Sequence, residues 1–205
     1  MKKVKTNYET ILKITRSMSM TMEAEDVILL AVEGIKTAMG VKGCALFLID
    51  KKTDELKLAG AYGLSDEYLN KGPLSALKSI AAAIDEGPVA IYDVSDDPRL
   101  QYPDAAKREG IASIMSVPIV IHNNVIGVLR IYTAEPWEFT MEDVNFVQAV
   151  AQIAGMAIEN CRYAKGLKGS IEILKSLRDP RSIKSKKRTP YEGVPKTVKP
   201  GEASA

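Results

Sequence analysis

The sequence has few of the side chains on which catalytic and metal centres are commonly built. Its 205 residues include one histidine and two cysteines. The cysteines, Cys44 and Cys161, have neither metal-binding spacing nor the number needed for a disulfide framework, which fits a reduced cytoplasmic compartment. A general base or metal ligand at His122 would need an acidic, cysteine or second histidine partner, but its neighbours are Asn123 and Asn124. We therefore expect His122 to be a surface turn residue, and we expect neither a metal site nor an enzyme.

Long hydrophobic runs are absent as well. The longest apolar stretches, 117–121 and 149–158, are shorter than the ~20 residues that cross a bilayer as a helix. The basic N-terminus is not followed by the apolar segment of a secretion signal. The sequence therefore predicts a cytoplasmic protein without a membrane span.

Charge is unevenly distributed along the chain. Residues 1–177 carry 20 basic and 23 acidic side chains, whereas residues 178–205 carry 8 basic and 3 acidic ones. The composition of 181–205 predicts a disordered tail. Its basic run, 184–188, is accompanied by neither interleaved aromatics nor a DNA-binding helix, which favours a solvated tail or weak electrostatic tether over specific nucleic-acid binding.

Hydrophobic periodicity places helices at both ends of the chain and strands between them. Helices are predicted over 7–18 and 23–39, after Gly63, over 74–85 and 104–109, from Thr140 onward, and over 170–178. Strands are predicted over 43–50, 55–62, 89–93, 111–121 and 125–132. Gly40 is the expected C-cap of the second helix, and Thr140 with Asp143 forms a capping box by residue type.

The strands 111–121 and 125–132 give the strongest β signal and predict a hairpin closed by a turn at 122–124. Pro118 has no amide proton, so it predicts a sheet edge or a bulge within the first strand. Strand pairs without a crossover helix imply an antiparallel sheet. Helices at both ends of the chain are expected to pack together on one face of that sheet, which gives an α+β fold.

A few polar side chains are candidates for binding. Ser113 and Ser116 interrupt the apolar strand and, three residues apart, point to opposite faces, so at most one of them faces a pocket. Asp93, Asp96 and Asp97 lie in a loop, and we favour turn-forming hydrogen bonds over a cation site for these carboxylates.

Several segments, taken in this order, resemble the GAF domain family over about residues 20–162. They are Val89–Val94, Asp97–Arg99, Gly110–Ile119, Val125–Leu129, Phe139–Asp143 and Gln152–Asn160. The resemblance implies a profilin-like, six-stranded antiparallel sheet with the terminal helices on one face and a ligand-pocket cover, residues 63–110, on the other.

The resemblance also divides the chain and suggests a role. It implies an N-terminal dimerising helix over 1–19, the GAF-like domain over 20–165, a helical extension over 166–180 and the basic tail over 181–205. GAF domains mostly regulate other proteins by binding a small molecule and dimerising through flanking helices. The terminal helices here carry apolar stripes, namely Tyr8, Ile11, Leu12, Thr15 and Met18, and Ile171, Leu174 and Leu177. Such stripes either fold back on the domain or pair with a second copy of the chain, and we favour a parallel homodimer.

The cyclic-nucleotide-binding class of the family fits poorly. Such domains often carry an Asn-Lys pair after the last core strand, then Phe, three residues, Asp and Glu. Phe139 and Asp143 match this pattern. Thr133 and Ala134 stand where Asn-Lys is expected, however, and Val144 stands where Glu is expected.

The chromophore-binding and enzymatic classes fit poorly too. Bilin-binding members use a cysteine, usually beside a histidine, whereas Cys44 lies in the first strand and His122 in a turn. Haem or iron would need ligands that this pocket does not offer. Members that reduce free methionine sulfoxide use several cysteines near the pocket, and this chain has none between 45 and 160. The cofactor therefore stays unknown.

We accordingly predict a non-catalytic, bacterial-type sensor that binds an unidentified small molecule and acts in trans on a separate signalling protein. Alternatives are an interaction module whose pocket is filled by its own side chains and, less favoured, a sulfoxide reductase or cyclic-nucleotide binder. The predicted ligand-binding residues are Phe47, Tyr62, Tyr92, Asp93, Ser113, Ile114, Ser116 and Tyr132.

Overall fold

The computed structural model describes residues 8–20, 23–75, 87–95 and 97–178. The predicted tail, Asp96 and most of the predicted helix 74–85 lie outside the described residues, as do the side chains of Met18 and Leu177. The chain divides into two compact units, Met1–Ala164 and Lys165–Ala205. The first holds the sheet and the cavity described below.

Six strands form one antiparallel sheet in the order β3-β2-β1-β6-β5-β4. The strands are β1 (Gly43–Asp50), β2 (Glu55–Tyr62), β3 (Leu74–Ser75), β4 (Val89–Ile91), β5 (Ser113–Ile121) and β6 (Asn124–Thr133). The helices are α1 (Tyr8–Met20), α2 (Ala24–Met39), α3 (Asp66–Leu69), α5 (Pro103–Glu109) and α6 (Met141–Arg178). The predicted six-stranded antiparallel α+β fold is confirmed.

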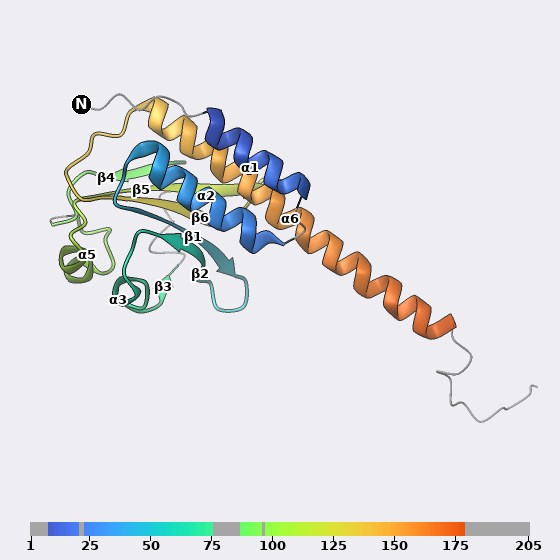
Figure 1. The fold of residues 1–205 in the computed structure, drawn as a ribbon. Helices are drawn as coiled ribbons and strands as arrows, with labels where there is room; N and C mark the ends of the chain where they lie inside the picture. Colours follow the sequence, from blue (N-terminus) through green and yellow to red (C-terminus); the bar gives the residue numbers. More distant parts are fainter. Residues whose placement is uncertain (1–7, 21–22, 76–86, 96, 179–205) are drawn as a thin grey trace, which may run out of the picture. The chain divides into compact units, whose positions relative to one another are not determined.

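Helices α1, α2 and the first part of α6 cover one face of the sheet (Figure 1). Their apolar stripes meet the sheet in one core, to which α1 contributes Ile14, α2 contributes Ile35, and α6 contributes Val147. The layers approach closely because glycine lies at the contact: a Cβ added at Gly155 of α6 would stand 2.6 Å from Cγ2 of Ile119 in β5. The prediction that the terminal helices share one face is therefore confirmed.

A second, smaller core lies on the opposite face of the sheet. Tyr68 of α3, Leu74 of β3 and Ala106 of α5 pack there against Phe47 of β1 and Tyr132 of β6. Short elements from the predicted cover thus close this face, as Figure 1 shows for α3, β3 and α5. The described residues of 63–110 form the expected cover.

The central hairpin is β5–β6. Its turn residues His122 and Asn123 have φ values of 49° and 61°, the left-handed pair that a two-residue hairpin turn requires. Pro118 lies beyond Ser116, the last β5 residue paired with β4, so its missing amide interrupts no bond on that side. A bulge follows directly, between Ile119 and Val120. Both the edge and the bulge expected from Pro118 are present.

The ends of the long helices follow their local signals. Gly40 caps α2 in the left-handed conformation, with φ of 67°. At the start of α6, the Thr140 amide donates to Asp143 Oδ2 at 2.8 Å, and the Asp143 amide donates to Thr140 Oγ1 at 3.2 Å. The predicted capping box is therefore formed by this reciprocal pair.

Two predicted helices differ from the structure. Leu74 and Ser75, expected to begin a helix, form β3 by pairing with Leu56 and Glu55; a sheet edge open to pairing overrides their helix propensity. The separate segment expected over 170–178 is continuous with α6, since a glycine costs a helix only ~1 kcal/mol, too little to break one of 38 residues. Within the described residues, no helix is long and apolar enough to cross a membrane.

Candidate functional site

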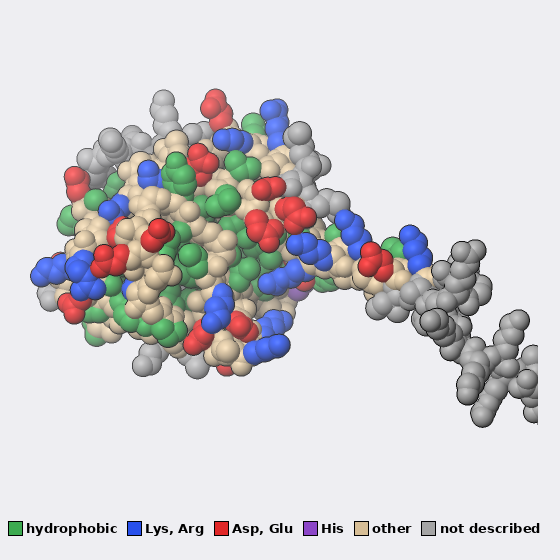
Figure 2. All heavy atoms as spheres, turned by 60° about the horizontal axis from the view of Figure 1, so that its bottom comes forward, with side chains coloured by type: hydrophobic (Ala, Val, Ile, Leu, Met, Phe, Trp, Pro, Cys, Tyr) green, Lys and Arg blue, Asp and Glu red, His purple; other side chains and the backbone are tan. Residues whose placement is uncertain are grey.

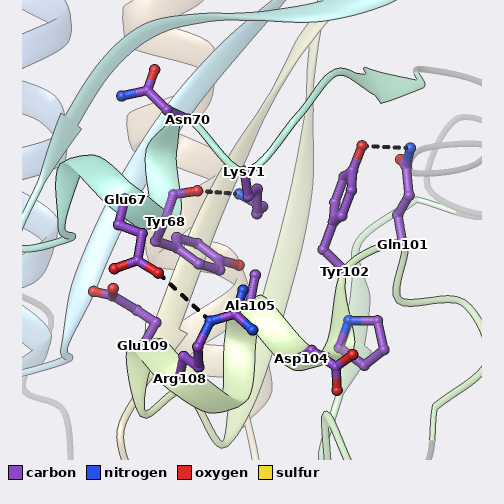
Figure 3. A pocket seen from close by; sticks show the side chains of 11 residues that line it. Glu67, Tyr68, Asn70, Lys71, Gln101, Tyr102, Asp104, Ala105, Arg108 and Glu109 are labelled. Carbon is purple, nitrogen blue, oxygen red and sulfur yellow. Dashed lines mark hydrogen bonds and ion pairs between the residues drawn. The ribbon is translucent and has the colours of Figure 1, made fainter.

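A cavity of about 490 Å³ opens between α3, the loop that follows it, and α5. This size is within the range of small-molecule sites, about 300–1,000 Å³. Figure 3 shows the 11 side chains that line it. They are Glu67, Tyr68, Asn70, Lys71, Gln101, Tyr102, Pro103, Asp104, Ala105, Arg108 and Glu109. The lining therefore combines charges of both signs with aromatic and small apolar groups.

One end of the cavity is held by hydrogen bonds between α3 and α5. Ser65 is the N-cap of α3, where its hydroxyl accepts from the Tyr68 amide at 3.2 Å. The Ser65 amide donates to Glu109 Oε1 at 3.0 Å, and its hydroxyl donates to Glu109 Oε2. Burial opposes ionisation of Glu109, but the Ser65 hydrogen bonds and the charges of Lys42 and Lys71 outweigh it and hold its pKa below the usual value.

The other end is held by contacts between the loop after α3 and the start of α5. The Tyr102 hydroxyl donates to the Pro73 carbonyl at 2.8 Å, and Gln101 Nε2 donates to the same oxygen at 3.1 Å. Gln101 Oε1 accepts from the Ser75 amide at 3.2 Å. Gly72 allows this approach, because its φ is 134° and an added Cβ would stand 2.7 Å from the Tyr102 hydroxyl. The cavity walls are therefore held together without help from a ligand.

Aromatic and basic side chains from the sheet lie behind the cavity. Tyr68 packs edge-to-face on Tyr132, with ring centroids 5.6 Å apart. The Arg130 guanidinium stacks over the Phe47 ring at 5.8 Å. Burial raises the pKa of both tyrosines, so their hydroxyls stay protonated. The Tyr132 hydroxyl is fully buried and has no hydrogen bond of good geometry among the described residues, although Tyr68 and Arg130 lie close to it.

Lys71 connects this layer to the cavity. Its Nζ atom lies 3.6 Å from the centroid of the Tyr68 ring and donates to the Tyr68 carbonyl at 3.0 Å (Figure 3). Burial, reinforced by the nearby charge of Arg130, lowers the pKa of Lys71 to about 8, and Glu109 opposes this shift. Lys71 therefore changes its charge close to neutral pH.

Four of the predicted ligand residues lie together on the sheet face behind the cavity. Phe47, Ile114 and Tyr132 belong to the core there, and Ser116 pairs with Arg130. None of the eight predicted residues is among the 11 that line the cavity. Ligand contact by these four residues stays a prediction, and the structure supports only their position behind the cavity.

The other four predicted residues lie elsewhere. Tyr62 stacks under Lys36 of α2, 5.3 Å from its Nζ atom, and Tyr92 is 56% exposed. The Asp93 carboxylate accepts from the Ser95 amide at 2.8 Å, which lowers its pKa and matches the expected turn chemistry. The Ser113 hydroxyl donates to the Tyr92 carbonyl at 2.7 Å and accepts from the Trp137 amide at 2.9 Å. The hydroxyl of Ser113 therefore links β5 to the segments at Tyr92 and Trp137.

The residues that line the cavity were missed by sequence reasoning because 63–75 and 99–109 carry no long periodic pattern. The sequence does contain a signal for a polar site at Arg130. A charged residue between Leu129 and Ile131, on the same strand face as Tyr132, is unusual in a buried strand and indicates a polar partner or site on that face.

The cysteines lie away from the cavity. Cys44 is fully buried on the helix-covered face of β1, and burial raises the pKa of its thiol. Cys161 of α6 is buried as well. Among the described residues, no three His, Cys, Asp or Glu side chains are placed to hold a metal ion.

A sequence model of the GAF domain matches residues 21–159. The chain belongs to the GAF domain family. GAF domains are typically sensor or regulatory domains of signalling proteins. A search among curated proteins finds no match.

Solved GAF structures share the fold. The GAF domain of an Acinetobacter phosphoenolpyruvate-protein phosphotransferase is 20% identical, with a TM-score of 0.64 over 76% of this chain and 94% of that one. A domain of a methyl-accepting chemotaxis protein is 23% identical, with a TM-score of 0.62 over 74% and 98% of the two chains. The free methionine-R-sulfoxide reductase of Neisseria meningitidis is 21% identical, with a TM-score of 0.64 over 77% and 90%. At these identities the likeness concerns the fold alone.

Proposed function

We propose that this GAF domain is a non-catalytic sensor that binds a small molecule in the cavity between α3 and α5. The observation that carries the proposal is the cavity itself, which has the volume of a ligand site and polar groups converging on it from two short helices. A pocket filled by its own side chains would leave no such space. The buried Cys44 and Cys161 give no support to thiol chemistry.

A ligand would act by strengthening the cover. The helix α3 spans four residues, and it is joined to α5 by the Ser65–Glu109 hydrogen bonds and by the ion pair of Arg108 Nε with Glu67 Oε1 at 3.6 Å. That ion pair is exposed and contributes little stability. A molecule that contacts both helices adds to these few bonds, so it favours the ordered state of the cover. The change would reach a signalling partner through the sheet and the helices on its other face.

The binding test measures the melting temperature of the protein with a panel of metabolites and uses native mass spectrometry of protein purified from its host. We expect at least one small molecule to raise the melting temperature, and we expect Arg108→Ala, in the cavity wall, to weaken that shift. Lys107→Ala is the matched control, because its exposed side chain lies on the same helix outside the lining. A panel without any shift, together with a native mass equal to the bare chain, would contradict the proposal.

We further propose that the sensor is a parallel homodimer formed through its terminal helices. On α1, Tyr8 and Leu12 are 72% and 54% exposed. In the second unit, Leu167, Ile171 and Leu174 are 65%, 49% and 61% exposed and follow the 4–3 spacing of a coiled-coil seam. Pairing with a second copy would remove these side chains from water.

The dimer is tested by light scattering. We expect the wild type to have twice the chain mass and Leu167→Glu to shift it toward monomer, because the charge would be buried in the seam. Lys168→Glu changes the neighbouring exposed side chain and should leave the dimer intact. A monomeric wild type at micromolar concentration would rule out this arrangement.

A further inference from the structure

We propose that the cavity recognises its ligand through an oxyanion, the carboxylate or phosphate group of a small organic molecule, bound at Nζ of Lys71 in front of Arg130. The inference rests on the proposed sensor function, because it names the class of ligand for the same cavity.

The ammonium group of Lys71 is held in place by contacts that use only part of its hydrogen-bond donors. It lines the cavity, and its position is fixed by the Tyr68 ring at 3.6 Å and the Tyr68 carbonyl at 3.0 Å. That carbonyl takes one of the three hydrogen-bond donors of an ammonium group. No carboxylate of the described residues forms an ion pair with Lys71. The remaining donors are therefore available to an acceptor in the cavity.

A second positive charge stands behind Lys71. Arg130 is 7% exposed, and its charge acts on Lys71 strongly enough to contribute to the lowered pKa. Two like charges in a partly desolvated site destabilise each other, and an anion bound at Lys71 offsets this repulsion. An oxyanion accepts charge-assisted hydrogen bonds, which are stronger than neutral ones.

The acidic side chains of the cavity are engaged elsewhere or lie opposite. Glu109 accepts from Ser65 and lies 3.8 Å from Nζ of Lys42, and Glu67 pairs with Arg108. Asp104 lies at the start of α5, on the side away from α3 in Figure 3. Lys71 is thus the lining group best placed to meet an anion.

The surface around the cavity does not select an anion at long range. Figure 2, which brings the cover side of Figure 1 forward, shows acidic and basic side chains mixed, with apolar ones between them. Recognition must then come from local contact at Lys71 and not from a broad field. Tyr102, Pro103 and Ala105 give the same cavity an aromatic and apolar wall. That wall suits the carbon body of an organic anion.

Protonation of Lys71 makes binding depend on pH. The groups that act on it are Arg130 from β6, Glu109 from α5, and Tyr68 from α3, whose hydroxyl stays neutral. Because the pKa of Lys71 is about 8 in the free protein and an anion raises it, affinity is highest below that pH. Above it, affinity falls by up to about tenfold per pH unit, since the ligand must bring a proton with it.

The experiment titrates the whole chain with benzoate, inorganic phosphate and neutral benzamide, using NMR chemical shifts and the melting temperature. We expect both anions to shift the resonances of α3 and α5 at millimolar concentration, with benzoate the tighter because of the apolar wall. We expect Lys71→Met to weaken the affinity for both anions by at least about tenfold, because it removes a charge-assisted hydrogen bond. The variant should also lose the pH dependence that Lys71 gives to binding. The exposed control Lys107→Met should bind like the wild type.

The outcomes separate this inference from the sensor proposal. Preferential binding of benzamide, or anion binding that Lys71→Met leaves unchanged in strength and pH profile, overturns the inference and leaves a sensor of neutral ligands. Failure of both anions to bind also overturns it. If the full metabolite panel fails as well, the sensor proposal falls with it. Lys71→Arg should keep the affinity but move its decline to higher pH, which a merely structural role would not do.

Discussion

Glu109, the last residue of α5, accepts two hydrogen bonds from Ser65, the N-cap residue of α3, although the two lie 44 positions apart in the chain. The Glu109 carboxylate thus joins the C-terminal end of α5 to the N-terminal end of α3, the two helices that line the cavity. The link makes the cover a single unit, so a perturbation at either helix is felt by both.

Ser65→Ala removes the side-chain cap of α3 and the hydroxyl hydrogen bond to Glu109 together, and it keeps the hydrogen bond from the backbone amide. We expect it to lower the free energy of unfolding by about 1–2 kcal/mol and to speed amide exchange in α3, as measured by urea unfolding and hydrogen exchange. Glu67→Gln breaks only the exposed pair with Arg108 and should cost less than about 0.5 kcal/mol. Equal effects of the two variants would show that Ser65 does not link the helices.

The same link predicts a pH dependence. The pKa of Glu109 lies below its ordinary value of 4.5 in the folded protein. The ionised group therefore stabilises the fold above about pH 4.5, and this contribution is lost as the pH falls through the folded-state pKa. Glu109→Gln should flatten that part of the stability curve, and a curve unchanged from the wild type would contradict the role given to the carboxylate.

The sequence carried enough information for the scaffold but not for the cavity. The helix cap at Gly40, the Thr140–Asp143 capping box and the turn at His122 depend on neighbouring residues in the chain. The faces of β5 and β6 follow from the alternation of side chains along a strand. These features could therefore be predicted. In the cavity Lys71 lies within the electrostatic influence of Arg130, although the two residues are far apart in the chain. No hydrophobic periodicity or capping residue within 63–75 predicts that these two residues come close. Leu74 is in a strand only because it pairs with β2, which its local sequence does not indicate.

Lys71 should affect stability with the same pH sense as Glu109, but in a window at higher pH. Its folded pKa of about 8 lies below the ordinary 10.5, so the unfolded chain binds the extra proton between these values and stability gains with rising pH there. Lys71→Met lacks this gain. The free energy of unfolding of the variant minus that of the wild type should therefore fall by about 1 kcal/mol between pH 7 and pH 10, after allowance for solvent screening.

Urea unfolding across this range checks the Lys71 prediction, with Lys107→Met as the exposed control on α5. The quantity of interest is the difference between variant and wild type, in which contributions shared by the two proteins cancel. A difference that does not change with pH would mean that Lys71 keeps an ordinary pKa.

The glycines of α6 offer a matched pair of substitutions. An added Cβ at Gly155 would stand 2.6 Å from Ile119 and 3.1 Å from Ile121, whereas one at Gly166 meets nothing within 4 Å. Gly166→Ala should stabilise the helix by about 0.5–1 kcal/mol through propensity alone. Gly155→Ala gains the same propensity but overpacks the core, so we expect a net loss of about 1 kcal/mol. A gain at both positions in thermal unfolding would show that α6 does not press on the sheet at Gly155.

The thiols decide between a sensor and a redox enzyme of the same fold. Cys44 is fully buried on the helix-covered face of β1, and burial raises its pKa, so it should hold little of the thiolate that attacks a sulfoxide or a disulfide reagent. Cys161 of α6 is 8% exposed. We therefore expect a disulfide reagent at pH 8 to leave both thiols unmodified in the folded protein and to modify both after unfolding. Cys44→Ala should bind ligands as the wild type does. Thiol-dependent reduction of methionine sulfoxide by the wild type, lost in Cys44→Ser, would overturn this assignment, because it requires a thiolate that reaches the substrate, and the folded core would have to open to supply one.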